Sequence, residues 1–236
     1  MSDGGDDDRR HSRAVIPILI NNPIKRAEAE AANGLLQYDA GIETINEALE
    51  RIEQGNRWKL RPSLITGLQR IALDGISSFA GNFRPSAVEI EKSIHAPPDA
   101  YLVRGLVEEL CDYVNENWDK KPLYLAAFIL WRLNWIHPFD DGNGRTSRVV
   151  SYIVLLIRMG NNLAGAPTIP ELITQHRRDY FSALDAADLA FSKTGQFDLT
   201  EMQKLLTSLL AKQLTTVMEI AGGISAEELI EILNGG

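Results

Sequence analysis

Apolar residues recur at helical spacing along most of this chain. From Thr146 to Met159, valine and isoleucine side chains fall three or four positions apart, which places them on one helical face. Similar patterns predict helices over residues 27–52, 62–76, 100–118, 122–136, 169–190, 199–220 and 225–233, with a break in the first near Asn33-Gly34. The chain is therefore expected to be all-α, apart from one segment.

That segment, residues 77–98, lacks a helical period and contains glycine and several prolines. Within it, Val88 and Ile90 alternate with the acidic Glu89 and Glu91, which predicts a small β-hairpin. The exposed edge of a hairpin can bind an extended peptide by strand addition, so these four residues are candidate docking positions. The alternative is a plain surface hairpin whose charges discourage aggregation.

The pattern divides the chain into four parts. Residues 1–13 are charged and glycine-containing, and we expect a disordered acidic tail. Residues 14–60 are predicted to be an N-terminal helical segment packed on the core domain, which spans residues 61–214. Residues 215–236 form a C-terminal helical extension that is a candidate regulatory element.

Composition narrows the class of protein. Hydrophobic residues make up 44% of the 236 positions, which is ample for a core. The net charge of −8 argues against a nucleic-acid partner, because a protein that binds nucleic acid normally has a basic patch. We find no signal-peptide pattern, and no apolar run approaches the roughly 18 residues of a membrane span. The single Cys111 cannot form an internal disulfide, so a reducing, cytoplasmic location is expected.

The segment 137–148 is the most informative stretch, because it combines several groups that handle phosphate. Gly142 and Gly144 flank Asn143 and allow backbone N–H groups to approach a ligand closely. The helix that follows exposes unpaired N–H groups and the positive end of its dipole, which suits an anion. Arg145 and Arg148 lie three residues apart, on one helical face, and can bind phosphate oxygens.

Two further residues of this segment are candidates for catalysis. His137 is of a type that serves as a general base near neutral pH, and Asp141 could hold Mg²⁺ together with phosphate oxygens. The combination fits phosphoryl or nucleotidyl transfer. The alternative is a glycine-rich helix N-terminus with solvated charges.

The same segment resembles the signature of the Fic family, His-x-Phe-x-Asp/Glu-Gly-Asn-Gly-Arg-x-x-Arg, and matches it at every specified position. The resemblance extends over roughly residues 33–214. Asn82-Phe83-Arg84, Val88-Glu89-Ile90 and Ala96-Pro97-Pro98 resemble the family's flap, and Arg178 to Leu184 resembles its later nucleotide-pocket helix. The resemblance implies a Fic-type helical domain with a β-hairpin flap that docks the target.

In that family the usual reaction transfers AMP from ATP to a hydroxyl of another protein. The resemblance implies that His137 deprotonates a Ser, Thr or Tyr of the target and that Asp141 binds Mg²⁺ between the α- and β-phosphates. Gly142, Asn143 and Gly144 would form the anion hole for the α-phosphate. The remaining implied ligands of ATP are Arg145 and Arg148 at the β- and γ-phosphates, and Tyr180 in the nucleotide pocket.

This chain departs from the family at the nucleotide pocket. The pocket helix often carries two adjacent tyrosines, whereas this sequence has Tyr180-Phe181, and Asp188 stands where an Asn is common. Loss of a hydroxyl and an amide donor alters how a base or ribose is held. Since some family members use UTP, GTP or CDP-choline, the nucleotide remains open.

Regulation is a second departure. Many Fic proteins carry an inhibitory helix with the pattern Ser/Thr-x-x-x-Glu-Gly/Asn, whose Glu pairs with the second motif arginine. Thr215 and Glu219 keep this spacing, but Ile220 replaces the final residue. Glu219 is therefore a candidate inhibitory residue, and the alternatives are a solvated helix charge or inhibition by an antitoxin-like protein.

Two rival functions remain at this stage. An enzyme of the same fold could transfer UMP or phosphocholine, or remove AMP. A non-catalytic adaptor could bind a nucleotide and a protein partner, but such an adaptor has no need of the base His137.

Overall fold

The computed structural model describes residues 10, 12–13 and 19–221, except the side chains of Arg13 and of residues 216–221. Its helices are α1 (Pro23–Glu53), α2 (Pro62–Ala72), α3 (Val103–Glu116), α4 (Pro122–Ile136), α5 (Asn143–Met159), α6 (Ile169–Gln175), α7 (Arg177–Thr194) and α8 (Thr200–Ala221). A 3-10 turn, Ala100–Leu102, precedes α3, and the two strands are β1 (Ser12–Arg13) and β2 (Glu89–Ile90). The prediction of an all-α fold is confirmed. Within the described ranges no helix is both long and apolar enough to cross a membrane.

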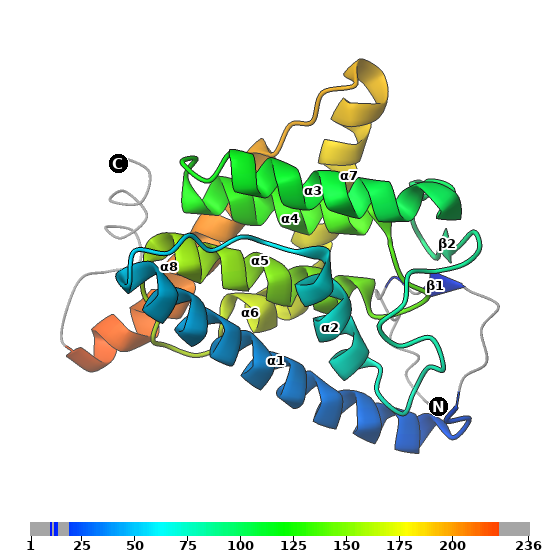
Figure 1. The fold of residues 1–236 in the computed structure, drawn as a ribbon, viewed down its shortest axis with the longest axis horizontal. Coiled ribbons are helices and arrows are strands. Elements are labelled where there is room, and N and C mark those ends of the chain that lie inside the picture. The colour runs from blue at the N-terminus through cyan, green and yellow to red at the C-terminus, as the bar shows by residue number, and fades with distance from the viewer. Residues whose placement is uncertain (1–9, 11, 14–18, 222–236) are drawn as a thin grey trace, which may run out of the picture.

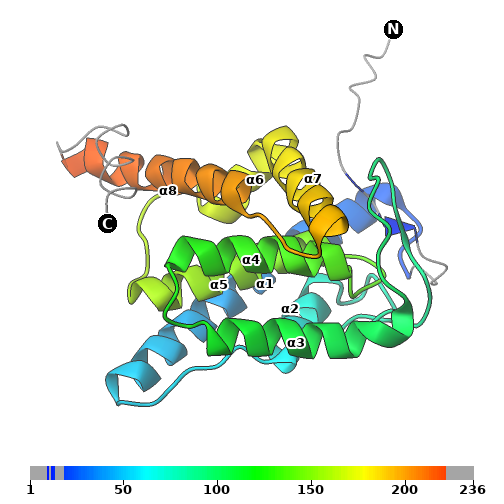
Figure 2. The same ribbon diagram turned by 90° about the horizontal axis from the view of Figure 1, so that it is seen from above.

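The centre of the molecule is the pair α4 and α5, which lie side by side in Figures 1 and 2. α4 is apolar on all sides, as expected for a helix enclosed by others, and its residues 125–131 are all buried. α1 and α2 pack against α5, α3 packs against α4, and α6, α7 and α8 cover the remaining side. The loop between α4 and α5 therefore starts and ends on the most buried helices of the fold.

α1 is longer than predicted and runs without a break through Asn33-Gly34. Asn22 caps its start by accepting hydrogen bonds from the N–H groups of Ile24 and Lys25, both at 3.0 Å. The Asn33 amide donates to the carbonyl oxygen of Asp74 at 2.8 Å. The sequence pattern predicted a helix break at Asn33, but the Asn33 side chain instead makes this long-range hydrogen bond from within the helix.

Two other predicted helices have different limits. The helix expected at 62–76 ends at Ala72, and the one expected at 169–190 is divided into α6 and α7 at His176. The carbonyl oxygen of Leu172 accepts from the His176 backbone N–H and lies 2.9 Å from the His176 Nδ1 atom, so His176 closes the end of α6. The break lets α6 pack on α5 and α8 while α7 packs on α4.

The flap contains one strand, and its partner is not the one predicted. β2 pairs antiparallel with β1, with Ser12 opposite Ile90 and Arg13 opposite Glu89, and not with a second strand of the flap. Residues 12–13 are thus ordered against the flap rather than part of a disordered tail. The apolar residues 14–18 and the helix predicted at 225–233 lie outside the described residues, and the division of the chain at residues 60 and 214 stays a prediction.

Candidate active site

The motif 137–148 comprises the connection between α4 and α5 and the first turns of α5. His137 ends α4 in the left-handed conformation, with φ 50° and ψ 60°. This conformation is uncommon for residues other than glycine, but histidine is among the types enriched in it. The His137 N–H donates to the carbonyl oxygen of Leu133 at 2.9 Å, which closes the helix. The chain turns sharply here, and the imidazole lines a cavity.

The turn is held from inside the core. Phe139 is fully buried, and the Asn143 side chain bridges its backbone: the Oδ1 atom accepts from the Phe139 N–H and the amide donates to its carbonyl oxygen, both at 2.9 Å. From α2, the buried Gln69 amide donates to the Asp141 carbonyl oxygen at 3.1 Å. Asn143 therefore fixes the loop with its side chain and can offer a ligand only its backbone N–H.

Gly142 caps the start of α5 with φ 77°. A Cβ atom at this position would lie 3.0 Å from the Leu73 Cδ2 atom, so both the backbone angle and the space favour glycine. The Gly142 N–H donates to the Asp141 carboxylate at 2.6 Å. The N–H groups of the first turn that follow, beginning with Asn143 and Gly144, have no partner within the helix, and both residues line the cavity.

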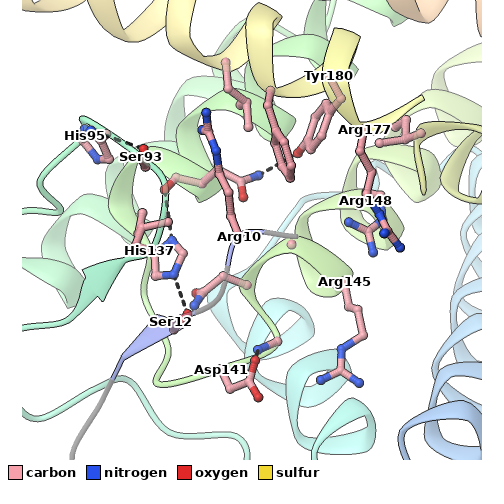
Figure 3. Close-up of a pocket in the computed structure, with 18 of the residues that line it drawn as sticks. Arg10, Ser12, Ser93, His95, His137, Asp141, Arg145, Arg148, Arg177 and Tyr180 are labelled. Carbon is pink, nitrogen blue, oxygen red and sulfur yellow. Dashed lines mark hydrogen bonds between the residues drawn. The ribbon is translucent and has the colours of Figure 1, made fainter. Parts of the chain in front are cut away.

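The His137 imidazole is oriented by two oxygen atoms. Its Nδ1 atom lies 3.3 Å from the Asn134 carbonyl oxygen, and its Nε2 atom lies 2.8 Å from the Ser12 hydroxyl oxygen. A carbonyl oxygen only accepts, so the neutral ring holds its proton on Nδ1 and leaves Nε2 as the acceptor. Nε2 therefore accepts a hydrogen bond from Ser12 (Figure 3).

Burial lowers the pKa of His137 to about 3, since only 6% of the residue is exposed. The hydrogen bond to the Asn134 carbonyl acts in the opposite direction, and the positive charges of Arg84 and His95 lower the pKa further. The imidazole is thus neutral at physiological pH, which is the form that can accept a proton.

This pKa predicts how stability depends on pH. The unfolded chain takes up a proton on His137 near its ordinary value of 6.5, whereas the folded chain stays neutral to about 3. The contribution of His137 is therefore present above pH 6.5 and lost as the pH falls. Relative to a His137→Asn variant, the free energy of unfolding of the wild type should fall by about 2 kcal/mol between about pH 7.5 and pH 5. Urea unfolding of both proteins at the two pH values measures the difference, and parallel pH dependences would contradict it.

Arginines gather at the end of the cavity beside α5. Arg145, Arg148 and Arg177 all line it, and Figure 3 shows Arg148 and Arg177 close together. Burial lowers the pKa of Arg148, the buried Tyr180 raises it, and the neighbouring charges of Arg145 and Arg177 lower it further. Because an arginine remains charged, this concentration of positive charge favours a polyanionic ligand.

The start of α1 reaches the same end of the cavity. Arg26 donates to the Asp141 Oδ2 atom and to the Glu30 Oε1 atom, at 2.8 and 2.9 Å. Glu30 in turn lies 3.7 Å from Arg145. These pairs hold the charged residues of the motif in place, and Asp141 keeps 37% of its side chain exposed. No local pattern marks Arg26 or Glu30 as site residues, because their partners in the motif, Asp141 and Arg145, are more than a hundred residues away.

The other end of the cavity is formed by α7. Tyr180 is buried, and its hydroxyl accepts from the Asn134 amide at 2.9 Å, so it connects α7 to the carbonyl that orients His137. Phe181 and Asp188 also line the cavity. The Trp131 indole N–H donates to Asp188 at 2.8 Å, and burial raises the pKa of this carboxylate. All three residues that the sequence placed in the nucleotide pocket thus reach one cavity, with a volume of about 730 Å³.

The structure places the side chains of the predicted docking residues Val88, Glu89 and Ile90, but it does not describe the side chain of the predicted regulatory residue. Val88 is buried and faces the core, whereas Glu89 is exposed and Ile90 lines the cavity. Glu91 follows β2 directly. The side chain of Glu219 lies outside the described residues, so its pairing with Arg148 stays a prediction.

Two residues that sequence reasoning assigned no role lie at the site. Arg84 is buried, and its guanidinium donates to backbone carbonyls on both sides of the flap and to that of His137. His95 lines the cavity with its Nε2 atom 2.8 Å from the Trp135 carbonyl oxygen. Neither has a local pattern that would reveal these partners.

The geometry defines a helical protein with a histidine, a carboxylate and arginines around the N-terminus of a buried helix. The model of the Fic/DOC family matches residues 59–155, which include α2 to most of α5. Residues 59–155 thus form a Fic/DOC domain.

Curated relatives agree. The chain is 31% identical over 160 residues to protein adenylyltransferase Fic of Aedes aegypti, a match covering 66% of this chain and 29% of that protein. It is 32% identical over 112 residues to the protein of the same name from Nematostella vectensis, covering 46% and 24%. The chain thus spans less than a third of the length of these relatives.

Solved structures share the fold. The Fic-1 structure of C. elegans, residues 134–508, has a TM-score of 0.63 and 22% identity, covering 89% of this chain and 55% of the other. A Fic domain containing signaling protein from Bacteroides thetaiotaomicron has a TM-score of 0.59 and 22% identity, covering 86% and 72%. These likenesses extend beyond residues 59–155 to most of the described helices.

Proposed function

We propose that this chain transfers AMP from ATP to a hydroxyl side chain of a protein. The observation that carries the proposal is the His137 Nε2 atom, an acceptor that faces the cavity lined by the N-terminus of α5 and by arginines that include Arg145, Arg148 and Arg177. A base for a hydroxyl and a site for a polyphosphate are thus adjacent. The name of the curated relatives, protein adenylyltransferase, supports AMP as the transferred group.

In the proposed reaction, His137 takes the proton of the target hydroxyl as its oxygen attacks the α-phosphorus of ATP. The bond from the α-phosphorus to the bridging oxygen breaks, and pyrophosphate leaves with the electron pair. The N–H groups of Asn143 and Gly144 at the start of α5, together with that of Gly142 once it leaves the Asp141 carboxylate, stabilise the charge on the α-phosphate. Arg145 and Arg148 hold the β- and γ-phosphates. The anionic triphosphate also raises the proton affinity of the nearby imidazole, which strengthens the base.

Asp141 is the residue that fits Mg²⁺. No group of three or more His, Cys, Asp or Glu side chains that could hold a metal occurs in the described part of the chain, so phosphate oxygens must complete the set. One carboxylate plus phosphates is a common arrangement for this ion. When bound, Mg²⁺ neutralises phosphate charge. Arg26 neutralises the same carboxylate in the free protein.

Tyr180, Phe181 and Asp188 would form the end that receives the base and ribose. Asp188 offers a carboxylate acceptor where an amide would offer both a donor and an acceptor. A carboxylate acceptor can recognise a hydrogen-bond donor on the base, such as an amino group. The adenine of ATP has such a donor, but so do other bases, and the experiment below therefore compares several nucleotides.

The flap residues Val88 to Glu91 are the proposed docking element for the protein target. The strand edge of β2 already accepts an extended segment, β1, which supports strand addition as the mode of binding. Control of activity is proposed to come from Glu219 or from an antitoxin-like protein.

The test uses ATP labelled at either the α- or the γ-phosphate. Wild-type protein with Mg²⁺ should transfer the α-label, but not the γ-label, to a mixture of soluble proteins, with AMP found on Ser, Thr or Tyr after digestion. GTP, CTP, UTP and CDP-choline in parallel separate the rival transferases by product mass. Transfer of the γ-label, or α-labelling equal to that of His137→Asn, would overturn the proposal.

A further inference from the structure

The strand edge of the flap is occupied by the chain's own N-terminal segment. β1 lies antiparallel to β2, and the register places Ser12 opposite Ile90. This is the arrangement by which an extended peptide binds an exposed strand. Because Ile90 lines the cavity, the residue opposite it lies at the cavity's mouth.

At this position the Ser12 side chain meets the base. The Ser12 hydroxyl oxygen lies 2.8 Å from the His137 Nε2 atom, within the distance that a general base requires for the proton it abstracts. The proton on Nδ1 is directed to the Asn134 carbonyl oxygen, so Nε2 is the acceptor of this pair. Ser12 is half-buried and lines the cavity.

Arg10 fixes the segment at a second point. Its guanidinium donates to both carboxylate oxygens of Asp185, at 2.9 and 2.7 Å, and lies 4.5 Å from the centre of the Phe181 ring. Figure 3 shows Arg10 and Ser12 directed toward the same cavity. The two side chains therefore hold the segment in one register.

We propose that Ser12 is a modification site of this protein, a hydroxyl to which the active site transfers AMP within the same chain. The inference rests on the proposed function and names one acceptor for it. The Ser12 proton passes to His137, the Ser12 oxygen bonds to the α-phosphorus of ATP, and pyrophosphate leaves. The products are chain-linked AMP and free pyrophosphate.

The cavity can receive the nucleotide with the segment in place. The cavity has a volume of about 730 Å³ while Arg10 and Ser12 line it. Ligand pockets commonly measure about 300–1,000 Å³. Tethering places the hydroxyl at a high effective concentration beside the base. Transfer within the chain is therefore expected to be independent of protein concentration.

The first experiment is intact mass and peptide mapping after incubation with ATP and Mg²⁺. Wild type should gain one AMP, located on Ser12. Ser12→Ala should lose this gain, whereas Ser86→Ala, a change of an exposed serine of the flap loop, should keep it. Titration of nucleotide binding by calorimetry should give the same affinity for Ser12→Ala and wild type, which shows that the loss concerns the acceptor and not the pocket.

The second experiment tests transfer within the chain. Wild type is mixed with His137→Asn, which keeps Ser12 but lacks the base. We expect AMP on the wild-type chain alone, with a first-order rate unchanged by tenfold dilution. AMP on the His137→Asn chain, or a rate that falls with dilution, would overturn transfer within the chain.

Failure of this inference is distinguishable from failure of the proposed function. AMP on a residue other than Ser12, or transfer to other proteins with none on Ser12, would overturn the inference and leave the function intact. Transfer of α-label by neither wild type nor Ser12→Ala to any protein would overturn both.

Discussion

His137→Asn should lower the rate of AMP transfer by about 10²–10⁴-fold, the usual contribution of a positioned general base. Asparagine is the matched replacement because it tolerates the left-handed angles of His137, with φ 50° and ψ 60°. Alanine would add strain at the same place. The loss is therefore expected to come from the missing base and not from a distorted turn.

The measurement is transfer of α-labelled AMP by both proteins at saturating ATP, beside nucleotide affinity measured by calorimetry. Affinity should be retained, since the phosphate groups are proposed to bind to α5 and the arginines. Equal transfer rates would remove His137 from the chemistry. Strong nucleotide binding without transfer in either protein would favour the adaptor function over the enzyme.

Arg84→Met should lower the free energy of unfolding by about 3 kcal/mol. The Arg84 guanidinium is buried and donates to the carbonyl oxygens of His137 and Ser86, both at 2.8 Å, and to that of Pro98. Burial lowers the pKa of Arg84, and Asp99 raises it. Methionine fills similar space but leaves these carbonyls unpaired, at about 1–3 kcal/mol each, partly offset by removal of a buried charge.

Urea unfolding measures this change, and Arg57→Met is the matched control. Arg57 is exposed in a loop, so its replacement should alter stability by less than about 0.5 kcal/mol. Arg84→Lys should lie between wild type and Arg84→Met, because a lysine keeps the charge but cannot donate in so many fixed directions. A loss no larger than that of the control would show that the carbonyls find other partners.

The partner strand of the flap could not be predicted from the sequence. Alternation at Val88 and Ile90 located the strand β2, but not its partner, since Ser12 of β1 lies 78 positions before Ile90, with which it pairs. A signal existed: Arg9, Arg10 and Arg13 interrupt the acidic start of the chain. Without knowledge of Asp185 facing Arg10, these arginines are interpreted as part of a solvated tail.

The sequence by itself determined the helices and the contents of the motif. Apolar residues spaced three and four positions apart define the apolar face of each helix. The motif keeps His137, Asp141 and Arg148 within twelve residues around one turn. Such features are local, so they can be read without the fold. The family resemblance adds the reaction for the same reason, because it depends on a contiguous signature.

Only the tertiary structure decided which distant groups meet at that turn. Ser12 at His137, Arg26 at Asp141, Arg10 at Asp185 and Arg84 at the His137 carbonyl all join segments far apart in the chain. Polar side chains of this kind have no period, and their partners are fixed by how α1, α7 and the flap pack around α4 and α5. The physical reason is that a hydrogen bond or ion pair depends on distance in space, which a single polar residue in a sequence does not specify.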